Sequence, residues 1–168
     1  MEKSRYEKYI VRRLEPPAHA GPTEGIRSKD WVNTGALVAC DKKLFKEATS
    51  IVEYGMVRGD TAQQGIRSGG AQPHKHDYDE VCLYMGTNPD DVYDLGAEAE
   101  TWLGEGEELE KIVFNTTSSL YRPAGLVHGQ MIWRNVRRPV LYILIMFNST
   151  DYVFKPASLE GRPISYGF

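Results

Sequence analysis

Residues 73–80 read PHKHDYDE and lead directly into the apolar run Val81–Met85. Side chains of an extended strand alternate between its two faces, so His74 and His76 lie on one face. Glu80 follows four residues after His76, where the apolar run begins. Two imidazoles and a carboxylate that converge from a strand and its turn are good ligands for a divalent first-row metal ion. This segment therefore predicts a strand that presents metal ligands.

A second segment, RPAGLVHGQM at residues 122–131, contains another histidine, His128. Pro123 and Gly125 favour a tight turn directly before the strand that would present this histidine. The chain has four histidines in all, and only His19 lies outside the two segments. An isolated histidine in a strand is usually an ordinary polar residue. The concentration of histidines in two motifs with matching turn residues favours a shared site instead.

The rest of the chain is divided into short pieces by glycine, proline, asparagine and aspartate, a pattern typical of an all-β sandwich or barrel. Almost nowhere does an apolar period of helical length persist. The predicted strands are Ala36–Cys40, Ser50–Arg58, Gln63–Arg67, Glu80–Met85, Glu98–Leu103, Glu108–Asn115, Ser119–Arg122, Val127–Trp133 and Val140–Asn148.

Length and composition narrow the classes of protein that fit. A chain of 168 residues fits one domain better than two. The net charge of −3 gives no electrostatic reason to expect nucleic acid or an anionic membrane as a partner. The longest apolar run, near Val140–Phe147, is too short for a membrane span. Two cysteines make no disulfide framework, and the first residues show no secretory signal, so we expect a soluble, cytoplasmic protein.

We expect three parts along the chain. Residues 1–35, rich in proline and glycine, form an irregular N-terminal arm in which Ser4–Leu14 is a candidate short helix. Residues 36–150 form a barrel, and residues 151–168 form a C-terminal tail that packs on it.

The two histidine segments resemble the motifs of a known family. The histidines and glutamate of residues 74–80 resemble the first motif of the cupin superfamily, HxHxxxE, and residues 123–128 resemble the second, PxGxxH. The resemblance covers about Ser50–Asn148. Three further motif positions differ, because Ser68 and Thr87 stand where the family has glycine and Ile132 stands where it has asparagine.

The resemblance implies an all-β fold, the conical cupin β-barrel, also described as a double-stranded β-helix or jelly roll. It also implies a metal ion held inside the barrel. Carried over residue by residue, the implied ligands are His74, His76, Glu80 and His128. The implied cofactor is one divalent transition metal per chain. Iron or manganese is favoured, and zinc, nickel and copper suit the same ligands.

Strand alternation adds candidates around the metal. Tyr84 shares a face with Glu80, and Gln130 shares a face with His128. We predict that Tyr84 and Gln130 are catalytic residues that orient substrate or a metal-bound water. Arg122, just before the proline turn, either contacts an anionic substrate at the barrel mouth or lies on the surface.

Three histidines and one glutamate would give a divalent metal site a net charge of +1, which suits an anionic, chelating small-molecule substrate such as an enediol, catechol or carboxylate. The first hypothesis is an oxidoreductase of the dioxygenase kind that acts on a small oxygenated or anionic molecule. The alternatives are a non-redox decarboxylase, isomerase or lyase, and a cupin that binds a small molecule without turnover. We also expect a homodimer formed through sheet edges, with the arm around Trp31 and Val32 crossing between subunits.

Overall fold

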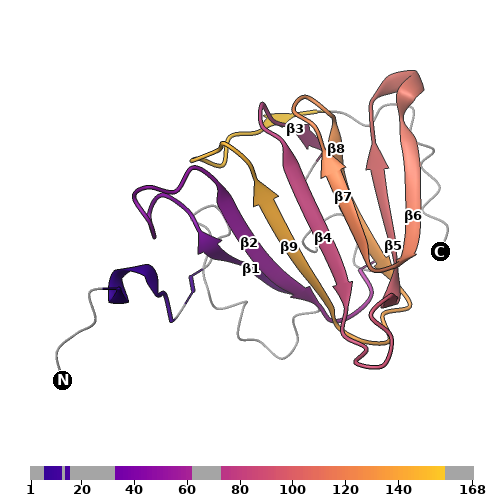
Figure 1. Cartoon of the computed structure of the whole chain (residues 1–168). Helices are drawn as coiled ribbons and strands as arrows, with labels where there is room; N and C mark the ends of the chain where they lie inside the picture. Colours follow the sequence, from indigo (N-terminus) through magenta and orange to yellow (C-terminus); the bar gives the residue numbers. More distant parts are fainter. Residues whose placement is uncertain (1–5, 13, 16–32, 62–72, 158–168) are drawn as a thin grey trace.

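The computed structural model describes residues 6–12, 14–15, 33–61 and 73–157, and these form two antiparallel β-sheets (Figure 1). The first sheet has the order β1-β2-β9-β4-β7, and the second has the order β10-β3-β8-β5-β6. The strands of the first sheet are β1 (Asn33–Cys40), β2 (Ile51–Val57), β4 (Glu80–Gly86), β7 (Ser118–Arg122) and β9 (Val140–Met146). Those of the second are β3 (His74–Lys75), β5 (Asp94–Leu103), β6 (Glu110–Thr116), β8 (His128–Arg134) and β10 (Lys155–Pro156).

The order of strands differs from their order in the sequence. In the first sheet β9 lies between β2 and β4, and in the second β8 lies between β3 and β5. Two antiparallel sheets connected by such crossovers are characteristic of a jelly roll. Among the described residues the only helices are the short 3₁₀ segments Glu7–Tyr9 and Gly106–Glu108. The all-β prediction is therefore confirmed, and no helix in the described part of the chain is long and apolar enough to cross a membrane.

The hydrophobic core lies between the two sheets. Tyr84 on β4 packs against Trp133 on β8 and Phe114 on β6, with 5.6 Å between ring centroids in both pairs. The buried members of this cluster come from both sheets: Val57, Cys82, Tyr84, Leu95, Ala97, Ala99, Trp133 and Val140. The core fills the inside of the barrel along part of its length, so a site inside the barrel must lie beyond one end of this cluster.

The predicted strands coincide with observed strands, except Gln63–Arg67, which lies outside the described residues. The largest difference is in β5, which begins at Asp94 rather than Glu98. Leu95, Gly96 and Ala97 are consecutive buried residues, and Gly96 has a φ of +74°, so the alternation is interrupted there by an irregularity in the pairing with β6. Such a bulge removes the period-2 signal on which the prediction of a strand depends.

The strand predicted for the first histidine motif is present only as the short β3, which ends before His76, and β10 was not predicted. β3 and β10 have two residues each, and they pair with one another through Lys75–Lys155 and His74–Pro156. This pairing places the chain after β9 beside the first histidine. In the predicted arm, the candidate helix Ser4–Leu14 is reduced to the single turn Glu7–Tyr9 among the described residues. Trp31 and Val32 lie outside them.

Candidate metal centre

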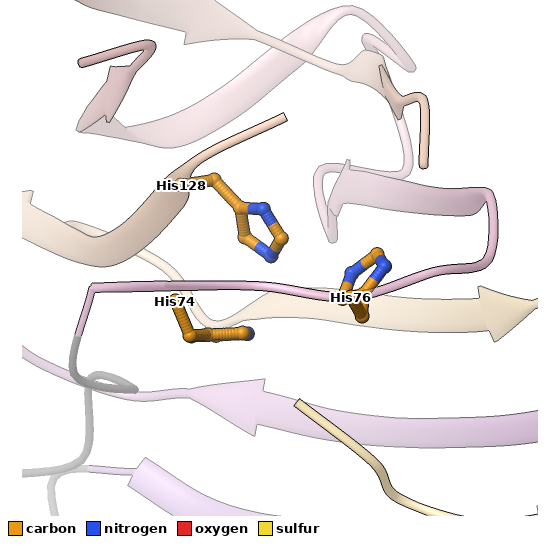
Figure 2. Close-up of side chains that lie close together, drawn as sticks. All are labelled: His74, His76 and His128. Carbon is orange, nitrogen blue, oxygen red and sulfur yellow. The ribbon is translucent and has the colours of Figure 1, made fainter. Parts of the chain in front are cut away.

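Three histidines converge at one end of the barrel. His74 on β3 and His128 on β8 are directly paired across the two strands, and His76 follows two residues after His74. The ring centroids of His74 and His128 are 4.4 Å apart, and those of His76 and His128 are 4.8 Å apart. One ring nitrogen from each residue lies within 4.8 Å of the other two, and the three rings face a common point (Figure 2).

Backbone carbonyls orient two of the imidazoles. Nδ1 of His76 lies 2.6 Å from the carbonyl oxygen of Tyr78, and Nδ1 of His128 lies 2.9 Å from that of Leu126. A carbonyl oxygen only accepts, so each Nδ1 carries the hydrogen and each Nε2 keeps a free lone pair. Both Nε2 atoms are buried and have no hydrogen-bond partner among the described residues. Imidazoles held in this way are the usual arrangement for metal-binding histidines.

Burial keeps both rings in the form that binds metal. His76 is 2% exposed and His128 is 1% exposed. Desolvation lowers the pKa of His76, and desolvation together with the nearby positive charge of Arg122 lowers the pKa of His128 to about 3. The two imidazoles are therefore neutral at pH 7, as coordination requires.

The two histidine motifs also stabilise each other's turns. The N–H of Gly125 donates to the carbonyl oxygen of His76 at 2.8 Å, and the N–H of Ala124 donates to Oδ1 of Asp79 at 2.9 Å. Gly125 has a φ of +86°, a conformation that glycine adopts without strain. The predicted turn before His128 is therefore present, and its glycine is required by backbone geometry.

Solved structures with a similar arrangement of strands include oxalate oxidases. An oxalate oxidase in complex with the substrate analogue glycolate aligns with a TM-score of 0.50 and 17% identity, over 81% of this chain and 58% of that chain. A recombinant oxalate oxidase in complex with glycolate aligns with a TM-score of 0.52 and 16% identity, over 89% of this chain and 63% of that one. The chain thus spans about three fifths of the length of these proteins. These oxidases are cupins.

The chain has the cupin fold. The resemblance drawn from the two motifs is confirmed for the fold, and the barrel is of the jelly-roll type. No family model and no curated protein sequence matches the chain. At such low identity the solved structures establish the architecture, while the chemistry of this chain has to be argued from its own residues.

Glu80, the implied fourth ligand, lies at the start of β4 and is 3% exposed. Its two oxygens have different surroundings. Oε1 accepts hydrogen bonds from Nη1 of Arg122 and, at 3.1 Å, from Sγ of Cys82, whereas Oε2 lies 3.8 Å from Nε2 of His76. Burial is the largest single influence and opposes ionisation, but the Arg122 charge and the hydrogen bonds from Cys82 and Arg122 together outweigh it and keep the pKa of Glu80 below its usual value. One oxygen of an ionised carboxylate thus faces the histidine cluster.

Arg122 is buried, so the expectation that it lies on the surface is wrong. It is 6% exposed, and β4 and β7 place it directly opposite Glu80 in the sheet. The sequence around Arg122 does not indicate that this residue pairs with Glu80, because the pairing depends on the register of β4 and β7.

The two predicted catalytic residues lie differently from each other. Tyr84 is 4% exposed and belongs to the apolar core cluster. It lies four residues along β4 from Glu80, roughly 13 Å at the usual rise of a strand. Gln130 is part of β8, but its side chain lies outside the described residues. A substrate-orienting role for either residue stays a prediction.

Sequence reasoning missed an acid on the inner face of the barrel. Glu53, in the middle of β2, is 5% exposed, and its strand alternates strictly between buried and half-buried residues. An acidic residue at a buried position of such a strand is a signal that the sequence IVEYGMV contains. Tyr78 was also missed; its ring stacks on that of His76 with 4.0 Å between centroids.

Proposed function

We propose that this cupin is a metal-dependent enzyme that binds a small anionic, oxygenated organic molecule at the three-histidine centre. The observation that carries the proposal is the pair of buried, unpartnered Nε2 atoms of His76 and His128. A buried nitrogen without a hydrogen-bond partner costs about 1–3 kcal/mol. A divalent metal bound by both nitrogens and by His74 would remove that cost.

In the proposed site, the three imidazoles and Oε2 of Glu80 hold the metal, and Arg122 holds Oε1 and fixes the orientation of the carboxylate. When bound, the metal would supply Lewis-acid chemistry and a template for substrate and dioxygen. The protein contributes a buried, oriented ligand set.

The charge of the site favours an anionic substrate. The imidazoles are neutral, and the negative charge of Glu80 is balanced by the positive charge of Arg122. A divalent metal would therefore leave a net charge of about +2 in a buried environment, one more than the ligands alone predict. Glycolate is the small hydroxy acid present in the structures of the oxalate oxidases. It has the negative charge that such a site favours, and its hydroxyl oxygen and one carboxylate oxygen could bind the metal together.

For the reaction, we propose an oxidoreductase of the dioxygenase kind, with iron or manganese as the metal. A non-redox reaction, such as decarboxylation, isomerisation or elimination, is the second candidate. It is favoured by one observation, the buried acid Glu53 on the same inner face of the barrel, because such reactions need a proton donor and acceptor. A binding cupin without turnover, the homodimer, the cytoplasmic location and the three-part division of the chain stay predictions.

Elemental analysis of protein purified without chelators tests the metal centre. We expect about one divalent metal per chain in the wild type, loss of the metal in His76→Ala, and retention in His19→Ala, which changes the histidine outside both motifs. Oxygen consumption on addition of small hydroxy and keto acids then separates the first reaction class from the second. Wild-type protein that contains no metal and takes up none on reconstitution would refute the metal centre.

A further inference from the structure

Glu53 is a buried acid that the proposed metal site does not use. It lies at an inward position of β2, between the inward residues Ile51 and Gly55. Its Oε1 atom is buried and has no hydrogen-bond partner among the described residues. A carboxyl group in this situation is destabilising unless it has a function or a missing partner, so it needs an explanation.

The sheet places Glu53 and the candidate ligand Glu80 on one inner surface. Glu53 pairs with Leu144 on β9, and Leu144 pairs in turn with Cys82 on β4. Directly paired residues of antiparallel strands point to the same face. The thiol of Cys82 donates a hydrogen bond to Glu80. The row of paired residues that begins at Glu53 therefore ends beside the ligand carboxylate. Two strand spacings, about 10 Å, separate the backbones of β2 and β4, and β9 lies between them in the sheet.

Two tyrosine side chains interact with Glu53. The hydroxyl group of Tyr152, in the chain after β9, lies close enough to the Glu53 carboxyl group to lower the pKa of that acid. Tyr78, whose ring stacks on His76, is within electrostatic range of both Glu53 and Glu80. The hydroxyl groups of both tyrosines therefore interact with the buried acid.

The charged and titratable groups that face Glu53 come from every element around it: Asp41 after β1, Tyr78 and Glu80 at the start of β4, Tyr142 on β9, and Tyr152 after β9. Within the described part of the chain, none of these groups carries a positive charge. Desolvation, with smaller contributions from Glu80 and Asp41, raises the pKa of Glu53 to about 7, although the Tyr152 hydroxyl opposes the rise. Near neutral pH, Glu53 therefore exists in both protonated and ionised forms, which is what a general acid–base residue requires.

We infer that Glu53 is the proton-transfer residue of this site, exchanging a proton with a ligand bound in front of the three histidines. The inference rests on the proposed metal centre. In the step, the O–H bond of the ligand breaks, its electron pair stays on the ligand oxygen, and the proton binds to the Glu53 carboxylate. The neutral acid returns that proton in the reverse step or to another atom of the ligand, so no external oxidant or reductant is needed.

The test uses cobalt alone as the probe. Cobalt(II)-loaded full-length protein is titrated from pH 5 to pH 9, and the visible absorption of the metal is recorded, with water as the exchangeable ligand. We expect one transition with a midpoint near pH 7 in the wild type. Glu53→Gln, which keeps the shape but does not titrate, removes it. Tyr152→Phe moves the midpoint upward, because the lost hydroxyl no longer stabilises the ionised carboxylate.

Glu100→Gln is the matched control, since Glu100 is another buried glutamate, on β5, with Trp102 and Arg134 as partners. Its transition should equal that of the wild type. A wild-type spectrum that does not change with pH, or a transition that persists in Glu53→Gln, overturns the role of Glu53 and leaves the metal centre intact. Failure of the wild type to bind cobalt overturns the metal centre, and the role of Glu53 with it.

Discussion

The N–H of Gly125 donates to the carbonyl oxygen of His76 at 2.8 Å, and this bond joins the two histidine motifs of the chain. The donor belongs to the turn that precedes His128, and the acceptor belongs to a ligand from the first motif. Because Gly125 has a φ of +86°, the bond forms only when the turn adopts a left-handed conformation. Backbone geometry in one motif thus determines where the imidazole of the other lies.

Replacing Gly125 by alanine should therefore weaken both stability and metal binding. Nothing lies within 4 Å of the position that a Cβ would occupy, so the cost is backbone strain alone, about 1–2 kcal/mol. Gly106→Ala is the matched control, because Gly106 also has a positive φ and open space at the Cβ position. Urea unfolding should show similar losses for both variants, whereas only Gly125→Ala should lower the affinity for zinc. Equal zinc affinities would contradict a coupling between the turn and the site.

Removing the Arg122 side chain should destabilise the protein strongly. Arg122→Met leaves the Glu80 carboxylate buried without its ion-pair partner, and the loss of one partner of a buried pair typically costs 3–5 kcal/mol. Arg137→Met, which removes an exposed partner of Asp94, should cost less than about 1 kcal/mol. Denaturant unfolding at pH 7 compares the two variants. A small loss in Arg122→Met would mean that the pair contributes little to the fold.

The pH dependence of Glu80 should change in the same variant. The pKa of Glu80 is lowered in the folded state, so its contribution to stability is present above the pKa of the unfolded chain and is lost as the pH falls through the folded pKa. Without Arg122, desolvation remains and raises that pKa. Acid unfolding of Arg122→Met should therefore begin at a higher pH than that of the wild type, which circular dichroism measures directly. An unchanged midpoint would show that Arg122 does not set the ionisation of Glu80.

His128 should make the metal-free protein sensitive to acid. Its pKa falls from 6.5 to about 3 on folding, so between these values the unfolded chain binds a proton that the folded chain does not. The free energy of unfolding should fall with decreasing pH across this window, by up to about 1.4 kcal/mol per pH unit for this one group. His128→Gln should have a shallower slope. Saturating zinc should steepen the loss, because protons then compete with the metal.

Local pattern was sufficient for the strands and for the histidines. The spacing of His74, His76 and His128 could be read directly, since both motifs keep ligand and turn residues within a few positions of one another. The burial of Arg122 and its pairing with Glu80 depend on the register of β4 and β7, which no local pattern specifies.

Two other features could not be predicted from the alternation of apolar and polar residues alone. The bulge at Gly96 hides the beginning of β5, and β3, the strand predicted for the first histidine motif, has only two residues and ends before His76. Glu53 differs from both, because its position on the buried face of β2 follows from alternation alone. What required the structure is its neighbourhood, above all the approach of Tyr152 from the far end of the chain.

An anomalous diffraction map of crystals grown with zinc tests the metal centre most directly. The account predicts one strong peak, about 2.0–2.1 Å from Nε2 of both His76 and His128 and from one ring nitrogen of His74. Oε2 of Glu80 should complete the set, with Oε1 still bound by Arg122. A peak at Nδ1 of either buried ring, a peak elsewhere, or no peak between the three histidines would contradict the account.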